Sequence, residues 1–299
     1  KSVFNNNNIF LLWIGHLISH AGDAVFMIAL PWLLLDITGS KSTTSFITIS
    51  AYLPAIMFGL FAGSIADYYP RKNVMIVSDL LRAGFVLLIP VSITVGITSP
   101  ILIGLITFLV ASAATPFYPA RDALITQIVS PDHLQSANSV ISTSGQLAHF
   151  MGPMIAGALV SLVGLTHLFT LDALSFGASL ICVSFVRLKK NYCPAIEKTQ
   201  LQLILDGIIY LRRNQGLAVL LTITSLNNLF IMGLAIIGIP VFVREILDTE
   251  FRTLAILEAS MAAGMILGSL ILLRFLKNVN PISILITGFI LDGITYSMV

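Results

Sequence analysis

The chain has very little charge for its length. Asp, Glu, Lys and Arg together make up 10% of its 299 residues, whereas hydrophobic residues make up 57%. A soluble domain carries about 25% charged and about 45–50% apolar residues. One or two globular cores could not hide this much apolar surface, so lipid must cover the rest. Cysteine is scarce as well: Cys182 and Cys193 lie in an apolar run and a basic segment, which argues against a disulfide framework.

The start of the sequence does not fit a cleavable signal peptide. A short polar lead, Lys1–Asn8, precedes an apolar stretch that is longer than a signal core. The first residue is not Met, and the last apolar run stops at Val299. We therefore expect the natural chain to be longer than this sequence. The formal net charge of +2 is too small to indicate a nucleic-acid partner.

Long apolar runs take the place of the missing charge. A helix needs about 20 apolar residues to cross the hydrocarbon core, whereas barrel strands alternate apolar and polar residues. Residues 101–110 do not alternate. We therefore predict an all-α integral membrane protein with about nine spans. The expected spans are residues 9–35, 43–66, 73–96, 101–120, 135–163, 166–186, 216–243, 253–275 and 281–299.

Basic residues are unevenly divided between the connections. With the N-terminus in the cytoplasm, twelve Lys and Arg fall in inside segments and only Lys41, Arg244 and Arg252 in outside segments. Cytoplasmic loops carry the excess of basic residues in membrane proteins. We therefore predict a multi-pass protein of the cell (inner) membrane with a cytoplasmic N-terminus.

The longest connection divides the spans into two groups. We expect residues 1–186 to form a six-helix bundle, 187–215 a cytoplasmic linker, and 216–299 a partial second bundle with spans seven to nine. Within the linker, residues 201–213 have apolar side chains mostly at helical spacing. This pattern indicates an amphipathic surface helix or an extension of the seventh span. Related halves are also indicated by the glycine pair of residues 59 and 63, which recurs at 264 and 268.

The most specific stretch runs from Gly63 to Lys72, between the second and third spans, and reads Gly-Ser-Ile-Ala-Asp-Tyr-Tyr-Pro-Arg-Lys. It resembles the signature loop of the major facilitator superfamily, G-x-x-x-D-x-x-G-R-[RK], with Pro70 where the family usually has Gly. The resemblance implies two six-helix bundles, of which this sequence would supply the first and about half of the second. It also implies a conformational role for a gating loop and charge cluster. These comprise Gly63, Asp67, Arg71, Lys72, Arg121 and Asp122.

Further stretches are similar to the bacterial efflux branch of that superfamily, which includes the macrolide efflux proteins and the enterobactin exporter. They include residues 22–31, 79–83, 119–125, 131–138 and 168–176. In the fifth span, Gly145 and the run Gly152-Pro153-Met-Ile-Ala-Gly157 resemble the antiporter motif, which is associated with exporters. Its glycines would permit close helix packing and its proline a kink, and such packing helps to control opening.

Polar side chains inside spans are costly in lipid, so they are the candidates for mechanism. Asp23 lies near the middle of the first span, with His20 and His16 three and seven residues earlier on the same helical face. Asp23 is the candidate for proton coupling or substrate binding, with His20 tuning or relaying the proton. Alternatively, both histidines are hydrogen-bonded structural residues. Arg82 either pairs with Asp79, three residues away, or faces the cavity and holds an anionic group.

Three further features of the spans stay open. His149 in the fifth span is another cavity candidate, although a lone His there is more often a packed residue. Asp172 in the sixth span has no evident partner in the sequence. The face that carries His16, His20 and Asp23 could hold a transition metal. Because one helix without Cys support is a weak donor set, we predict no metal and no other cofactor.

These features predict a secondary transporter that exports a small amphipathic compound by alternating access, driven by protons. Two alternatives remain: an importer or facilitator of the same fold, and a truncated fragment that does not transport. A membrane enzyme would need a cluster of catalytic side chains at one face, and the sequence shows none, so we predict no enzymatic activity. The expected partners are the lipid bilayer, a small-molecule substrate and protons.

Overall fold

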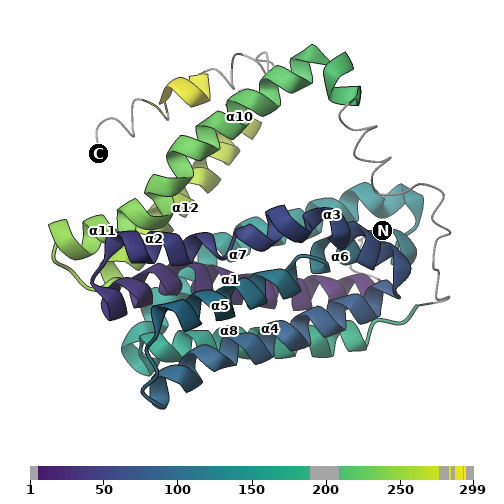
Figure 1. Ribbon diagram of the computed structural model, residues 1–299. Coiled ribbons are helices and arrows are strands. Elements are labelled where there is room, and N and C mark those ends of the chain that lie inside the picture. The colour runs from purple at the N-terminus through teal and green to yellow at the C-terminus, as the bar shows by residue number, and fades with distance from the viewer. Residues whose placement is uncertain (1–5, 189–208, 276–282, 284–286, 292, 294–299) are drawn as a thin grey trace.

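The computed structural model describes residues 6–188, 209–275, 283, 287–291 and 293. Within these ranges the regular structure is helical and contains no strand (Figure 1), as the sequence predicts. The first part holds α1 (Asn7–Thr38), α2 (Lys41–Ile49), α3 (Leu53–Tyr68), α4 (Arg71–Thr94), α5 (Pro100–Ala114), α6 (Phe117–Ile128), η2 (Pro131–His133), α7 (Leu134–Val163) and α8 (Leu165–Ser184). The second part holds α10 (Gln215–Gly233), η3 (Leu234–Gly238), α11 (Ile239–Val241), η4 (Phe242–Ile246) and α12 (Phe251–Phe275).

Six segments of the first part are long and apolar enough to cross a membrane. Five are α1, α4, the combined segment Pro100–Ile128, α7 and α8. The sixth is the pair Lys41–Gly59 and Phe61–Tyr68, which is bent by 63°. These segments match the first six predicted spans, and the chain is a multi-pass membrane protein.

The junction of α1 and α2 shows how local sequence ends one membrane helix and starts the next. Gly39 takes a φ of 61°, a left-handed conformation that glycine adopts without steric cost, and its N–H donates to the carbonyl of Leu35. Ser40 then caps α2, because its hydroxyl accepts a hydrogen bond from the N–H of Thr43 at 3.3 Å. The chain therefore turns within two residues.

Two predicted segments differ from the structure. The span expected at 101–120 continues to Ile128, because α5 and α6 are separated by only a short turn at 115–116. The seventh predicted span, 216–243, is not a regular α-helix, since the π-helical turns η3 and η4 flank the short α11. A π-turn accommodates extra residues without changing the apolar character of the segment, so hydropathy does not reveal it.

Two other expectations fall largely outside the described residues. Of the amphipathic segment 201–213, only residues 209–213 are described, and these are helical. Of the ninth predicted span, 281–299, the described residues 287–291 are helical.

Helix α1 is the centre of the first part and packs against α7 and α8. Small residues make the close approach possible. A Cβ added to Gly22 would overlap with Asp172 and Ser175 of α8, and one added to Gly152 of α7 would overlap with Ala24. Backbone therefore packs directly on backbone or on short side chains along α1, as is common between membrane helices.

The second part meets the first at the end of the bundle opposite the N-terminus. There α11 and η3 contact α1, η3 also contacts α2, and α12 packs against α7. Toward the N-terminal end, α10 runs apart from the bundle (Figure 1), and most side chains of residues 215–226 are exposed. The contact between the two parts is thus concentrated at one end of the molecule.

Candidate functional site

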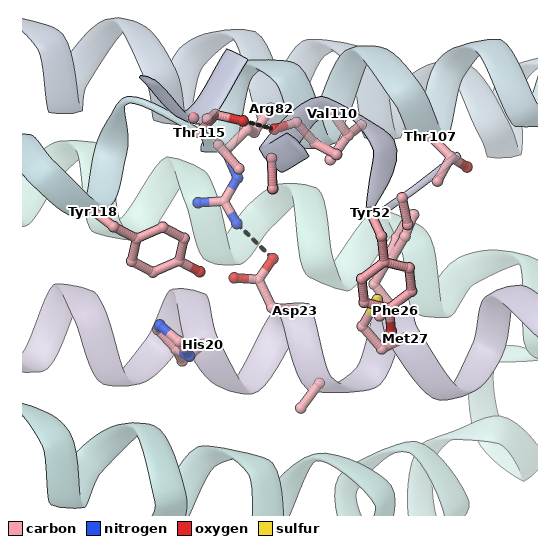
Figure 2. A pocket seen from close by; sticks show the side chains of 16 residues that line it. His20, Asp23, Phe26, Met27, Tyr52, Arg82, Thr107, Val110, Thr115 and Tyr118 are labelled. Carbon is pink, nitrogen blue, oxygen red and sulfur yellow. Dashed lines mark hydrogen bonds and ion pairs between the residues drawn. The ribbon is translucent and has the colours of Figure 1, made fainter. Parts of the chain in front are cut away.

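A cavity of about 410 Å³ opens beside the middle of α1. Its wall is mainly hydrocarbon and aromatic, and Asp23 and Arg82 lie at one side with His20 and Tyr118, whereas Tyr52 and Thr107 lie at the other (Figure 2). The lining residues are His20, Asp23, Ala24, Phe26, Met27, Ala51, Tyr52, Ala55, Gly59, Arg82, Thr107, Val110, Ala111, Ala114, Thr115 and Tyr118. A pocket with an apolar wall and a few convergent polar groups suits a small amphipathic ligand.

Arg82 of α4 joins two carboxylates from different helices. Its Nη2 donates a hydrogen bond to Oδ1 of Asp23 on α1 at 2.5 Å, and its Nη1 donates to Oδ1 of Asp79 at 3.5 Å. The side chains of Arg82 and Asp79 are 2% and 0% exposed, whereas that of Asp23 is 26% exposed toward the cavity. The sequence-predicted pairing of Arg82 with Asp79 is therefore present, and the same guanidinium also faces the cavity.

Aromatic rings complete the surroundings of the guanidinium. Its Cζ lies 3.8 Å from the ring centre of Phe176 on α8 and 5.7 Å from that of Phe117 on α6. Such a stack attracts a cation through the ring quadrupole and orients the planar fork. The hydroxyl of Tyr118 points toward Asp23 across the cavity in Figure 2. Arg82 is thus held by carboxylates along its plane and by rings on its face.

The two histidines of α1 take different positions. His20 lines the cavity with Asp23, and its ring packs edge-on against that of His16, with 4.1 Å between centres. His16 is buried, and its Nε2 lies 3.0 Å from Nη1 of Arg121. The predicted helical face is therefore formed, but only its two later residues reach the cavity.

Asp172 of α8 is a neighbour of this site that the sequence did not connect to it. Its side chain is 1% exposed, and its Oδ1 accepts a hydrogen bond from the hydroxyl of Ser175 at 3.4 Å. Its Oδ2 is buried and has no hydrogen-bond partner among the described residues. Removing an ionised carboxylate from water costs several kcal/mol even after the surroundings relax. The ionised form of Asp172 is therefore strongly disfavoured at this position.

The loop from Gly63 to Lys72, for which the sequence predicts a gating role, lies at the N-terminal end of the bundle. α3 ends at Tyr68, and Pro70 occupies the N-cap position of α4. Arg71 is buried and its Nη1 donates to the carbonyl of Ala123 on α6 at 2.9 Å. Lys72 donates through Nζ to the carbonyls of Ser184 and Val186, at 2.6 and 2.9 Å. The loop is therefore bonded to the middle of α6 and to the end of α8.

The predicted charge cluster is assembled differently from the expectation. In the described part of the chain, no ion pair joins Asp67 to Arg71 or Arg121. Arg121 pairs with the adjacent Asp122 at 2.7 Å and reaches His16 with its other nitrogen. Arg71 and Arg121 thus both fasten α6, one to α4 and the other to α1.

The glycine motif of α7 packs against both parts of the molecule. Gly152 and Pro153 are buried, and Gly152 faces Ala24 of α1. A Cβ on Gly157 would lie 2.6 Å from the Cβ of Ala255 on α12. Gly145 has nothing within 4 Å of an added Cβ. Close packing therefore applies to two of the three predicted glycines.

Two ion pairs connect the parts at the end opposite the N-terminus. Nη2 of Arg244 on η4 donates to Oδ1 of Asp36 on α1 at 3.0 Å, and Lys41 of α2 pairs with Glu245. Beneath them, the ring of Trp32 packs edge-on against Phe251 of α12, with 5.7 Å between centres. These contacts, with Gly157 on Ala255, close that end.

Two predicted features remain: His149, and the face of α1 that carries His16, His20 and Asp23 as possible metal ligands. His149 belongs to α7, but its side chain lies outside the described part of the structure. Among the described residues, no group of three His, Cys, Asp or Glu side chains comes close enough to hold a metal ion.

Known efflux proteins are similar in sequence to this chain. The chain is 25% identical over 294 residues to macrolide efflux protein A of Streptococcus pyogenes, covering 97% of this chain and 72% of that protein. It is 26% identical over 255 residues to multidrug efflux pump Tap of Mycobacterium tuberculosis, covering 83% of this chain and 59% of Tap. The chain thus spans between about six and seven tenths of these relatives.

Solved structures show the same fold. A bacterial homologue of the human lysosomal transporter Spinster, in an inward-facing and unoccupied conformation, superposes with a TM-score of 0.71 at 16% identity. The match covers 92% of this chain and 64% of that one. A peptide transporter, POT, solved with sulfate, gives a TM-score of 0.55 at 17% identity over 82% of this chain and 54% of that one.

A family model supplies the widest match. The family described as transmembrane secretion effector matches residues 2–295, nearly the whole sequence. Its relatives and structural neighbours are transporters, and the helical fold agrees with theirs. The chain belongs to the transmembrane secretion effector family of the major facilitator superfamily of membrane transporters.

Proposed function

We propose that this protein exports a small amphipathic compound across the cell membrane in exchange for protons, by alternating access. The observation that carries the proposal is the position of Asp23. This carboxylate both faces the cavity and binds the buried Arg82, so that a ligand or a proton reaching the cavity competes with the guanidinium. A change at Asp23 is thereby transmitted to α4 and, through Phe176, to α8.

A proton can supply the energy that the proposed cycle needs. One elementary charge moved through the membrane potential releases about 2.3 kcal/mol per 100 mV. Protonation of Asp23 would weaken its charge-assisted bond to Arg82, and such bonds contribute about 1.5–3 kcal/mol each. The two quantities are of similar size. A single titrating carboxyl is therefore enough to bias the packing around Arg82.

The contacts between the two parts support alternating access. The parts meet at the end that carries Asp36 and Arg244, whereas α10 stands apart near the N-terminal end. We propose that the N-terminus is cytoplasmic, which makes the closed end extracellular and this conformation open toward the cytoplasm. Residues 1–186 and 216–299 would then be the moving bundles, with 187–215 as their linker. The charged loop from Gly63 to Lys72 would control the cytoplasmic side.

The names of two relatives guide the choice of compounds. One is named a macrolide efflux protein and the other a multidrug efflux pump. Both names fit the apolar cavity wall with its polar edge. We therefore propose amphipathic antibiotics as the first substrates to test.

The test compares accumulation of a labelled macrolide, and of a panel of amphipathic dyes, in cells that express the chain. Wild type should lower accumulation, and a protonophore should abolish the difference. Asp23→Asn should abolish efflux while the protein remains in the membrane. Asp248→Asn is the matched control: Asp248 is exposed and has a φ of 49°, which Asn tolerates. Full efflux by Asp23→Asn would overturn the coupling role.

A second assay separates export from the other modes of transport. Counterflow of labelled compound is measured in proteoliposomes with and without a proton gradient. A facilitator would give the same exchange rate in both. An importer would raise accumulation in cells instead of lowering it. Equal accumulation in expressing and empty cells across the whole panel would contradict transport by this chain.

A further inference from the structure

The buried charges around Arg82 do not balance. Arg82 supplies one positive charge, and Asp23 and Asp79 are bonded to it. Asp172 of α8 is a third carboxyl, whose Oδ1 lies against the backbone of α1 at Gly22, the residue before Asp23. Ionisation of all three acids would leave two uncompensated negative charges in the middle of the bundle. Protein interiors avoid such charges, and a carboxyl without a cation takes up a proton instead.

The geometry identifies the acid that is neutral. Asp23 has a direct bond to the guanidinium and access to the cavity. Asp79 also has a buried Oδ2 without a hydrogen-bond partner among the described residues, but its Oδ1 lies 3.5 Å from Nη1 of Arg82. Asp172 forms no ion pair with Arg82 in the described part of the chain. Its Oδ1 lies 3.4 Å from the hydroxyl of Ser175, which also donates to the backbone carbonyl of Asp172 at 2.7 Å, and its buried Oδ2 has no partner among the described residues. It is packed onto the backbone of α1 at Gly22, where not even a Cβ would fit. Water is therefore kept from it on that side.

We propose that Asp172 is a second proton-binding carboxyl, which holds a proton while Arg82 is bonded to Asp23. The exchange step rests on the proton-driven efflux proposed above. When Asp23 gains a proton from the cavity, Arg82 is released from it and turns to Asp172. Asp172 then gives its proton to water in the cavity beside Asp23 and becomes the partner of the guanidinium. One proton is taken up and one is released, and the buried group keeps a net charge of minus one throughout.

This exchange gives α8 a role in the cycle, although none of its described residues lines the cavity. Asp172 and Phe176 lie one helical turn apart on α8, and Phe176 already stacks on Arg82. Movement of the guanidinium from Asp23 to Asp172 would therefore shift contact from α1 to α8. The hydroxyl of Ser175, which donates to the backbone carbonyl of Asp172 at 2.7 Å, can turn to Oδ1 of the resulting carboxylate at 3.4 Å.

Infrared spectroscopy of the purified full chain in lipid nanodiscs tests the protonation directly. Wild type at neutral pH should show the carbonyl band of a protonated carboxyl, and Asp172→Asn should lose that band. Asp248→Asn should lose a carboxylate band instead and serves as the matched control. Loss of a carboxylate band in Asp172→Asn would overturn the proposal. If that variant does not accumulate in the membrane, Asp172→Glu serves, since it moves the band rather than removing it.

The exchange has its own readout in Asp23→Asn. This variant frees Arg82 from its ionised partner, so the protonated-carboxyl band of the unchanged Asp172 should weaken by at least half at neutral pH. An unaltered band would overturn the exchange. These spectra require no substrate and no transport. A missing efflux activity would therefore contradict the proposed function. It would not affect the conclusion on the protonation of Asp172, which the spectra decide.

Discussion

Arg244 reaches Asp36 across the junction between the two parts, with 3.0 Å between Nη2 and Oδ1. The residues are 208 positions apart in the sequence, and both lie at the end where α1 and α2 meet η4. Arg244 also covers the ring of Trp32, at 5.8 Å from its centre. The pair must break if that end opens. Substitutions at these two residues should therefore shift the proposed conformational equilibrium.

The first prediction concerns this pair. Asp36→Arg should place like charges at the junction and favour separation of the two parts, and Asp36→Arg/Arg244→Asp should restore much of the closed state. Because the side chain of Asp36 is 61% exposed, we expect a modest coupling. Exposed pairs contribute about 0.2–1 kcal/mol, or roughly 1.5- to 5-fold in an equilibrium constant.

Spin labels on cysteines introduced at Ser42 and Glu250, in a chain without Cys182 and Cys193, would report the distance across the junction. Both positions are exposed. The single variant should broaden the distribution toward long distances, and the swap should narrow it again. Identical distributions in the single and the swapped variants would show that the pair does not hold this end closed.

The second prediction uses two glycines of α7 that differ only in their surroundings. Gly145→Ala should stabilise the protein by about 0.5–1 kcal/mol, because Ala favours a helix over Gly and the added Cβ meets open space. Gly152→Ala should destabilise it by about 1–3 kcal/mol, because the added methyl overlaps with Ala24.

Thermal unfolding in detergent should therefore move in opposite directions for the two alanine variants. Each variant is the control for the other, since the substitution and the helix are the same. Equal shifts would mean that α1 and α7 are not packed as closely as Gly152 and Ala24 indicate.

The third prediction concerns the anchoring of α8 by Lys72. Its ammonium group donates to the carbonyls of Ser184, the last residue of that helix, and of Val186 just beyond it, and the last carbonyls of a helix have no helical partner. Lys72→Met keeps the length of the side chain and removes both bonds. We expect a loss of about 1–2 kcal/mol in local stability, since the group is partly exposed.

Amide hydrogen exchange of the last turn of α8 should accelerate about 5- to 30-fold in Lys72→Met, the factor that corresponds to this free energy. Lys41→Met removes an ion pair at the opposite end and should leave this exchange unchanged. Unaltered protection in Lys72→Met would mean that the loop residue does not secure the helix end.

The helices of this fold could be predicted from the sequence more completely than the contacts between them. Apolar length was enough to place α1, α4, α7 and α8, because lipid requires about 20 apolar residues and tolerates only closed backbone hydrogen bonding. The pairing of Arg82 with Asp79 was also predictable, since residues three apart share a helical face. Local rules therefore recover what lies on one helix.

Contacts between helices did not follow from such rules. Asp23 and Arg82 are 59 positions apart, and nothing in the spacing of either helix indicates that their faces meet. Asp172 was left without a partner for the same reason. The sequence does contain a chemical indication: an arginine inside a membrane span requires a carboxylate partner, and the spans contain few acidic residues. Each of those acids could therefore have been considered as a partner of Arg82.

The last prediction separates the charge of Arg82 from its shape. A lysine would keep the positive charge, but its single nitrogen could not donate from two separate positions to Asp23 and Asp79 while a planar group stacks on Phe176. Arg82→Lys should therefore reach the membrane and lose most of the efflux. Arg252→Lys, on the exposed side of α12, is the matched control and should transport normally.

Removal of the charge altogether should act on stability instead. Arg82→Ala leaves two carboxylates without their cation, and breaking a buried pair in this way costs about 3–5 kcal/mol. Addition of Asp79→Ala removes one of those orphaned acids, so Arg82→Ala/Asp79→Ala should unfold at a higher temperature than Arg82→Ala alone. Thermal unfolding of the three proteins measures this order. Efflux by Arg82→Lys at the wild-type rate would show that charge alone suffices at this position, and that the two-armed bridge between α1 and α4 is not part of the transport mechanism.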